Sequence, residues 1–231
     1  MFNKIYKTTI EALADIKDGA TIMLGGFAGG QGAPYNLIDS LIERGVKNLT
    51  VIANNHLPIN DLAREKQVKK ALICFEGPAT YDPRYRFLED AHRNGEVEVE
   101  VMGFGVLTWR IQAWGSGVAG FYTRVGVDTL LAKGKEERIF DGEKYIFERA
   151  LGADFALIKA YKSDTKGNLL YRKAARNINP TMAMGANTVI VEVDDIVEVG
   201  ELDPETIVTP SIFVDRIVKA KTKRTVIKLK S

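Results

Sequence analysis

The sequence is poor in the residues that bind metals or form disulfides. Its 231 residues include one cysteine, Cys74, and two histidines, His56 and His92. A lone cysteine forms no internal disulfide, and its position in the apolar run Ala71–Phe75 indicates a small buried hydrophobic side chain. The histidines and the cysteine do not have the spacing of a metal-ligand set. We therefore expect neither a disulfide framework nor a metal site.

An excess of one charge sign and long apolar runs are also lacking. Lys and Arg total 32 against 30 Asp and Glu, for a net charge of +2. This balance favours neither nucleic acid nor an anionic membrane surface as a partner. No apolar run approaches the ~18 residues of a membrane span. The charges Lys4, Lys7, Glu11 and Asp15 interrupt the amino-terminal region, which excludes the apolar core of a secretory signal. We expect a cytoplasmic location, or an organelle matrix if the protein is imported, with no nucleic-acid or membrane partner.

The sequence also lacks internal repeats and flexible linkers. The chain shows no internal repeat with a period of about 20 to 50 residues and no Pro/Ser-rich linker. Its composition, 45% hydrophobic and 27% charged, suits a globular fold long enough to bury a sizeable core. We therefore predict a single α/β domain over residues 1–231, with a short basic carboxyl-terminal tail from about 219 to 231.

What the chain does have is a glycine-rich loop between a predicted strand and a predicted helix. Thr21–Leu24 is typical of a buried strand, and Pro34 opens the next helical pattern. The loop Gly25–Gly32 between them holds five glycines. Open α/β sheets bind ligands at the carboxyl ends of their strands, and free N–H groups near a helix start bind anions or a developing oxyanion. A tight turn that needs positive φ angles explains the loop equally well.

The loop does not match the named phosphate-binding motifs. No Gly-Lys-Ser/Thr follows it, so it is not a P-loop. Gly-x-Gly-x-x-Gly fails because Tyr35 stands where the third glycine would follow Gly30 and Gly32.

Strand and helix patterns alternate along the rest of the chain. Thr8 and Glu11 predict a capped first helix, and Gly45 ends the helix that follows the loop. Further strands are predicted at Leu49–Ala53, Ala71–Phe75, Ala153–Tyr161 and Thr188–Val193, and further helices at Asn60–Gln67, Asp82–Arg93 and Ala175–Ala186. The alternation predicts an α/β fold, an open and mainly parallel sheet with helices on both faces.

Two segments depart from this alternation. Asp141-Gly142 between two strand-like runs predicts a hairpin, and hence a small antiparallel excursion from the main sheet. Glu96, Glu98 and Glu100 alternate with valines, and we interpret them as the solvated face of an edge strand rather than as paired catalytic carboxylates.

Aromatic residues are scattered through a glycine-rich stretch between Gly103 and Gly126. They are Trp109, Trp114, Phe121 and Tyr122, together with the aliphatic Ile111. The weak periodicity predicts an irregular segment that forms an active-site wall or a subunit interface, with ordinary core packing as the alternative.

The glycine-rich segment resembles a family hallmark. Asp18-Gly19, three apolar residues, Gly25-Gly26-Phe27 and then Gly32-x-Pro34 are similar to the α subunit of 3-oxoacid-type (family I) coenzyme A transferases. Further similar segments follow in the same order at Leu49–Asn55, Gly167–Leu169, Ala175–Pro180, Val191–Val193 and Val208–Pro210. The similarity extends from about Ile5 to Lys219, and it implies a CoA-transferase-like fold.

The chain departs from the family pattern at two places. Four residues, Ala28 to Gln31, separate Phe27 from Gly32, where the family has three. The family commonly has Pro-Gln-Gly-Thr-Leu at a strand end, whereas this chain has Gly103–Leu107. The family glutamine lies near bound substrate. Because Phe104 replaces it here, the acyl specificity of the relatives does not apply to this chain by resemblance alone.

The resemblance implies covalent catalysis by a glutamate carboxylate. That carboxylate attacks an acyl-CoA thioester, and the resulting acyl-glutamyl anhydride is opened by the CoA thiolate to a glutamyl-CoA thioester. In the family this glutamate lies in the β subunit, within a Ser-Glu-Asn-Gly-like segment that is absent here. The chain is thus expected to be the α subunit of a heteromeric enzyme that requires a β partner. Glu76 is the in-chain candidate, although a structural role suits it better.

The resemblance also assigns the remaining site residues. The loop residues Gly25, Gly26, Phe27, Ala28, Gly29, Gly30, Gln31 and Gly32 would contact CoA or acyl substrate. Asn54 would donate its amide to the thioester carbonyl, with an Asx turn as the structural alternative. Asn55, Phe104 and Gly105 would line the substrate pocket. Arg176 either binds a substrate carboxylate or pairs within the protein. CoA and acyl-CoA enter as substrates, and no permanently bound cofactor is expected.

The sequence leaves two other functions open. A sugar-phosphate isomerase or deaminase of related fold would use the loop for phosphate, and a regulatory module would use it for an effector. No appended DNA-binding helix pair is apparent, which disfavours the regulator. Binding of a sugar phosphate rather than a CoA ester would distinguish both from a transferase.

Overall fold

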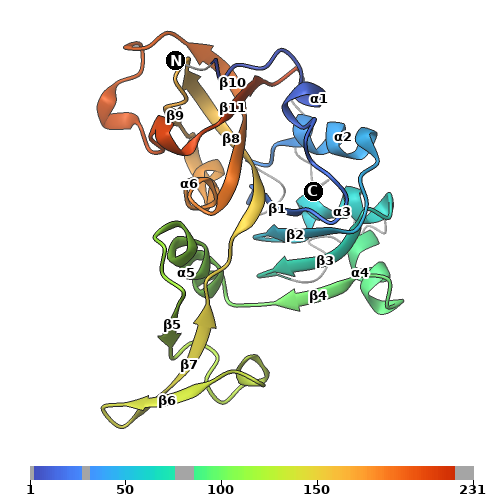
Figure 1. Cartoon of the computed structure of the whole chain (residues 1–231), viewed down its shortest axis with the longest axis vertical. Helices are drawn as coiled ribbons and strands as arrows, with labels where there is room; N and C mark the ends of the chain where they lie inside the picture. Colours follow the sequence, from blue (N-terminus) through green and yellow to red (C-terminus); the bar gives the residue numbers. More distant parts are fainter. Residues whose placement is uncertain (1–2, 28–31, 76–85, 222–231) are drawn as a thin grey trace, which may run out of the picture.

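The main body of the protein is a parallel β-sheet. A computed structural model describes residues 3–27, 32–75 and 86–221 (Figure 1). The strand order is β11-β10-β8-β1-β2-β3-β4, and all of these neighbours pair in parallel. The strands are β1 (Thr21–Leu24), β2 (Leu49–Ala53), β3 (Val68–Ile73), β4 (Glu98–Val101), β8 (Ala153–Asp164), β10 (Ala186–Val197) and β11 (Arg216–Lys219), and β9 (Leu169–Leu170) pairs antiparallel with β8. The predicted α/β fold is therefore confirmed.

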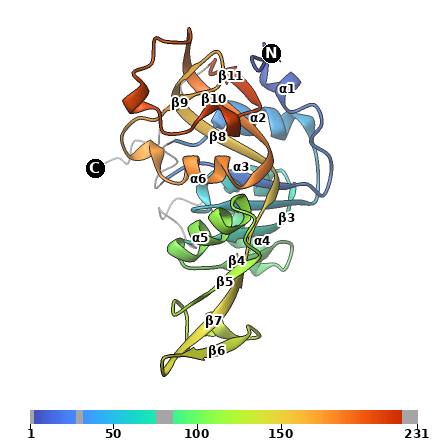
Figure 2. The same ribbon diagram turned by 60° about the vertical axis from the view of Figure 1, so that its left-hand side comes forward.

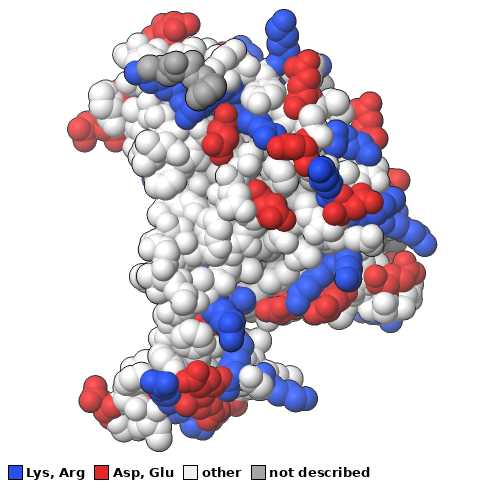
Figure 3. Space-filling model, in the orientation of Figure 1, with Lys and Arg blue, Asp and Glu red and all other residues white. Residues whose placement is uncertain are grey.

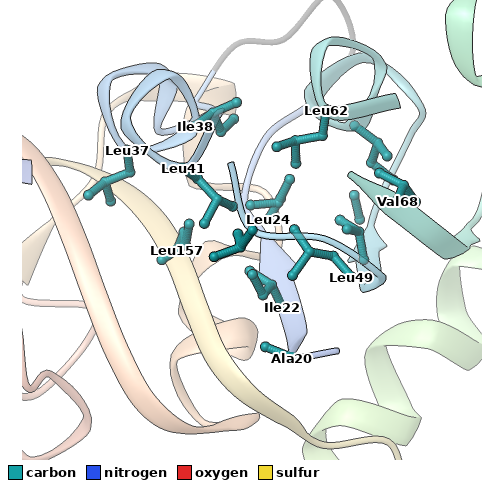
Figure 4. Packing of buried hydrophobic residues seen from close by; sticks show 14 of the residues in the cluster. Ala20, Ile22, Leu24, Leu37, Ile38, Leu41, Leu49, Leu62, Val68 and Leu157 are labelled. Atoms are coloured by element: carbon teal, nitrogen blue, oxygen red, sulfur yellow. The ribbon is translucent and has the colours of Figure 1, made fainter. Parts of the chain in front are cut away.

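Helices cover both faces of this sheet, as the sequence predicts. One layer consists of α1 (Thr9–Ala12), α2 (Tyr35–Arg44), α3 (Leu57–Arg64) and α4 (Phe87–Arg93). The other contains α5 (Phe104–Gly115) and α6 (Asn179–Ala183), which come forward in Figure 2. Successive strand residues alternate between two cores: Ile22 and Leu24 pack under the first layer (Figure 4), and Met23 packs under the second. This period of two is what a strand buried on both faces requires.

A second, antiparallel sheet projects from the lower end of the molecule in Figure 1. Its order is β5-β7-β6, formed by β5 (Gly120–Thr123), β6 (Glu137–Phe140) and β7 (Glu143–Arg149). The predicted hairpin is confirmed, because Asp141 and Gly142 connect β6 to β7 with φ angles of 51° and 80°. Two positive φ angles are typical of a type I′ turn. The described residues also form the 3₁₀ helices η3 (Leu130–Ala132), η4 (Lys173–Arg176), η5 (Pro204–Thr206) and η6 (Ser211–Phe213).

Several local predictions hold closely. β1 and β2 have the predicted bounds, Thr8 accepts a hydrogen bond from the Glu11 amide at 3.2 Å, and Gly45 ends α2 with φ 68°. The acidic strand β4 does lie at the sheet edge, where Lys70 Nζ of β3 lies 2.8 Å from Glu98 and 3.0 Å from Glu100.

The predicted helix Ala175–Ala186 is wrong in its bounds, because only Asn179–Ala183 is α-helical. The chain instead forms η4, turns at Asn177 with φ 32°, forms the short α6, and enters β10 at Ala186. Pro180 lacks the N–H that a continuous helix would need and disfavours helical geometry before it. The asparagine side chains of this segment are used in long-range contacts that override its helical pattern.

The predicted irregular stretch after Gly103 is also wrong in part. Residues 104–115 form the three-turn helix α5, with Gly103 as its N-cap. Its apolar residues lie on the buried face (Val106, Leu107, Ile111) and also on the outward side, which masks the helical period. Gly115 has a packing role, because a Cβ there would lie 2.4 Å from the Met184 carbonyl oxygen.

Other boundaries shift by a few residues. Instead of Asn60–Gln67, α3 occupies Leu57–Arg64 with Pro58 in its first turn, and β3 starts at Val68 rather than Ala71. Of the predicted helix Asp82–Arg93, residues 82–85 lie outside the described residues, as does the basic tail from 222 onward. Among the described helices, none is both long enough and apolar enough to cross a bilayer.

Candidate active site

The predicted site residues gather at the carboxyl edge of the sheet. Gly25–Phe27 follow β1, Asn54 and Asn55 follow β2, and Phe104 lies three residues after β4. Cys74 and Phe75, which were not predicted as site residues, follow β3. These four strands are parallel neighbours, so their carboxyl ends meet at one edge. This edge is where open α/β sheets bind their ligands. Ala28 to Gln31 and Glu76 lie outside the described residues.

Two asparagines that lie far from the glycine-rich loop in the sequence clamp that loop by hydrogen bonds. Asn177 Nδ2 donates to the Gly26 carbonyl at 2.7 Å, and Asn179 Nδ2 donates to the Gly32 carbonyl at 3.2 Å. Asn179 Nδ2 also donates to the Ala175 carbonyl at 2.9 Å, while its Oδ1 accepts from the Lys159 amide at 3.2 Å. Both described ends of the loop are therefore held by one segment, which extends from the end of η4 to the first residue of α6.

Glycine is required where this clamp touches the loop. A Cβ on residue 25 would lie 1.9 Å from Asn179 Oδ1, and one on residue 32 would lie 2.5 Å from the Ala175 carbonyl oxygen. Gly32 also has φ +69°, in the left-handed region that glycine adopts at little cost. The glycines at these two positions thus permit close packing, and Gly32 also adopts the positive φ angle that a tight turn was expected to need.

The start of α2 is already occupied by a carboxylate of the protein. Glu192 of β10 is 2% exposed and accepts from the Asn36 amide at 2.8 Å, the Leu37 amide at 3.2 Å and Asn36 Nδ2 at 2.9 Å. Lys159 Nζ lies 3.2 Å from Glu192 and 2.7 Å from Asp194. The Asn36 and Leu37 N–H groups therefore already donate to a carboxylate of the protein and are not free for an anion.

Three consecutive buried polar residues follow β2. Asn54, Asn55 and His56 are 3%, 7% and 8% exposed. Asn55 Oδ1 accepts from the Leu57 amide at 3.0 Å, so the Asx-type turn considered for Asn54 is made by its neighbour. Asn54 Oδ1 and Asn55 Nδ2 have no hydrogen-bond partner in the described structure. Buried polar atoms without partners are uncommon in folded proteins, and they mark a place where a ligand can supply the missing bond.

His56 shares this unusual environment. Neither ring nitrogen makes a well-aligned hydrogen bond, and burial lowers the pKa of the imidazole below its ordinary 6.5 despite the opposing influence of the nearby Phe75 backbone and the Glu89 charge. The side chain is therefore neutral at pH 7. Cys74 is half-buried, and burial raises its pKa to about 12, which keeps it a thiol.

The other predicted site residues are partly exposed. Phe27 and Phe104 are 37% and 38% exposed at the carboxyl edge, and Gly105 lies in the first turn of α5. Arg176 is an exposed residue of η4, not of the helix that was predicted. The described residues contain no group of three or more His, Cys, Asp and Glu side chains suited to a metal.

Comparison with known proteins identifies the class. Residues 6–220 match the family model for coenzyme A transferase. The chain belongs to the coenzyme A transferase family. It is 49% identical over 222 residues to one subunit of the 3-oxoadipate CoA-transferase of Pseudomonas putida, with 94% of each chain covered.

Longer relatives carry the same region within a larger chain. The sequence is 38% identical to the human succinyl-CoA:3-ketoacid coenzyme A transferase 2, a mitochondrial protein, covering 94% of this chain and 45% of the human one. An acyl-CoA transferase from Escherichia coli O157:H7, solved as a thioester complex with CoA, superposes with a TM-score of 0.84 at 20% identity, over 98% of this chain and 51% of that one. The chain thus spans about half the length of these two proteins.

Sequence reasoning missed the supports of the site rather than its location. The segment Ala175–Pro180 resembles the family pattern, but no local signal in it predicts that its asparagines hold the loop. Glu192 offered a signal, because a carboxylate between Val191 and Val193 in an apolar strand must find partners when buried. Those partners lie on α2, which only the tertiary structure places beside it.

Proposed function

We propose that this chain is the α subunit of a heteromeric CoA transferase that moves CoA between an acyl-CoA and a short-chain carboxylic or 3-oxo acid. The observation that carries the proposal is the meeting, at one sheet edge, of the glycine-rich loop held by Asn177 and Asn179 with the buried amide of Asn54, which follows the neighbouring strand β2. The family membership and the names of the relatives, 3-oxoadipate and succinyl-CoA:3-ketoacid transferases, support this substrate class.

The chemistry assigned to this chain is to hold a thioester. The Gly25–Gly32 loop presents backbone to the CoA ester, and Asn54 presents an amide to the thioester carbonyl as negative charge develops on its oxygen. A single oxyanion donor of this kind contributes about 3 kcal/mol in other enzymes. Asn55, Phe104 and Gly105 are proposed to shape the acyl pocket beside it.

The nucleophile is assigned to the partner subunit. Its glutamate attacks the thioester carbonyl and the C–S bond breaks. The CoA thiolate departs, and an acyl-glutamyl anhydride forms. Attack of that thiolate on the glutamyl carbonyl of the anhydride releases the carboxylic acid and forms the glutamyl-CoA thioester. Within the described part of this chain, the buried Glu192 is not available for this role because α2 and Lys159 already bind it.

The test compares the chain alone with the complex. A tagged chain is expressed in its native host, the co-purifying protein is identified by mass spectrometry, and both are assayed with acetyl-, succinyl- and butyryl-CoA donors. We expect negligible turnover by the chain alone, and by the complex ping-pong kinetics and a CoA adduct on the partner. Robust turnover by the purified chain alone would overturn the division of roles. Absence of CoA transfer by the complex with every donor would overturn the proposed reaction.

A further inference from the structure

The outward face of α5 carries no charged side chain. Residues Phe104, Thr108, Trp109, Gln112 and Ser116 follow the helical spacing of one face. Trp109 is 62% exposed and Phe104 is 38% exposed. The charged residue within α5, Arg110, is turned inward, with its Nε donating to the Arg149 carbonyl at 2.8 Å. An exposed helix face without charge is unusual in a chain in which 27% of residues are charged.

The surface around this helix has the same character. In Figure 3 the region over α5 and α6 is almost uniformly uncharged, whereas charged side chains cover the layer of α1 to α4 and the β6 hairpin. A pocket of about 390 Å³ opens between α5 and β5, lined by Trp109, Gln112, Val118, Phe121 and Met184 among others. Two of the lining residues, Trp109 and Phe121, have ring centroids 6.4 Å apart.

This face is continuous with the candidate active site. Phe104 belongs to both, because it opens α5 at the carboxyl end of β4. On the adjacent strand β3, Phe75 follows the carboxyl end and is 58% exposed. Any protein that covers the outward face of α5 therefore also approaches the loop and Asn54.

We infer that the outward face of α5, together with the pocket between α5 and β5, is the docking surface for the partner subunit that supplies the catalytic carboxylate. This inference rests on the proposed function. A partner must place its carboxylate at the carboxyl edge, and α5 is the element whose exposed face begins there. In the human and Escherichia coli proteins this chain matches about half of a longer polypeptide, so those proteins carry further chain that can cover such a face.

The composition of the face fits a protein partner rather than a substrate. Stable interfaces have cores depleted in charge and enriched in Trp, Phe and Met, and pockets that receive an anchoring side chain. CoA carries phosphates and the acceptor carries a carboxylate, and the outward face of α5 presents no cation to bind them.

The test introduces charge into the outward face of α5. Gln112→Glu replaces an amide by a carboxylate of the same size at the centre of the face, and Thr108→Lys adds a cation one turn earlier. Asn48→Asp is the matched control, because it makes the same amide-to-carboxylate change at an exposed turn before β2, at the opposite edge of the sheet. Melting temperatures of the isolated variants identify any loss of fold.

Two quantities are measured. Sedimentation gives the dissociation constant for the purified partner, and fluorescence gives the tryptophan emission maximum. Both tryptophans of the chain lie on α5. We expect Gln112→Glu and Thr108→Lys each to weaken association at least tenfold and Asn48→Asp to leave it unchanged. Partner binding should shift the emission of the wild-type chain to the blue, and Trp109→Phe should remove most of that shift.

The inference is overturned if both charged variants bind the partner like the wild type or if the emission does not move. It is also overturned if the isolated wild-type chain is a dimer that Gln112→Glu dissociates, since a second copy would then occupy the face. If the wild-type complex is active and the charged variants bind the partner normally, the docking surface is refuted but the proposed function is not. A complex that forms but transfers no CoA refutes the proposed function instead.

Discussion

Asn179 Oδ1 lies in the space that a side chain on Gly25 would occupy. A Cβ on residue 25 would come within 1.9 Å of that oxygen and within 3.4 Å of Ile158 Cα in β8. The asparagine cannot retreat without losing its hydrogen bonds to the Lys159 amide, the Gly32 carbonyl and the Ala175 carbonyl. The end of β1, which leads into Gly25, and the segment that carries Asn179 therefore pack as one unit.

Gly25→Ala should destabilise the protein by about 3 kcal/mol, because displacing Asn179 breaks three hydrogen bonds worth about 1 kcal/mol each. Urea unfolding measures this change. In the double variant with Asn179→Ala, the combined cost should be smaller than the sum, since the space is then free. Additive costs would show that the two residues do not compete for that space.

Gly105→Ala is a matched comparison within the candidate pocket. A Cβ there meets nothing within 4 Å, so the substitution should stabilise α5 by up to about 1 kcal/mol through helix propensity. If Gly105 lies against the acyl group as proposed, KM for the acyl-CoA should nevertheless rise. An unchanged KM in the stabilised variant would remove Gly105 from the pocket.

Asn177→Ala should loosen the loop without touching the reacting atoms. The variant loses the 2.7 Å bond to the Gly26 carbonyl, at a cost of about 1 kcal/mol in stability. In the active complex, KM for the CoA ester should rise more than kcat falls, because the loop binds the ester in ground and transition states alike. A selective fall in kcat would instead place Asn177 near the reacting carbonyl.

Asn54→Ala should have the opposite kinetic signature. Its amide is proposed to act when charge develops on the thioester oxygen, so kcat should fall about a hundredfold or more with little change in substrate binding. Stability should change little or improve, because the substitution removes a buried oxygen that has no partner. Unchanged turnover would exclude Asn54 from the oxyanion role.

Acid should destabilise the protein through His56. Burial lowers the pKa of its imidazole below 6.5, so below that pH the unfolded chain binds a proton that the folded chain does not. The free energy of unfolding should therefore fall as the pH drops below about 6.5, with no contribution from His56 above it. His56→Asn should reduce the difference in unfolding free energy between pH 7.5 and pH 5. An equal difference in both proteins would contradict this assignment.

The sequence alone determined the architecture, because local interactions encode it. Short apolar runs, separated by helical patterns, produced the parallel strands that are buried on both faces; Gly45 ended α2, and Asp141-Gly142 produced the hairpin. Each of these signals depends on neighbours within one element or one turn. The resemblance to the family then located the glycine-rich loop and the asparagines after β2 as site residues.

Only the tertiary structure decided how that site is held. Asn177 and Gly26 are 151 positions apart, and Asn36 and Glu192 are 156 apart, yet their hydrogen bonds fix the loop and the helix that follows it. The same contacts broke the predicted helix at Ala175–Ala186 and filled the start of α2. The uncharged face of α5 was hidden because a helix with apolar residues on two sides has no clear period. Folding brought these residues together, and no local pattern in the chain records such distant partners.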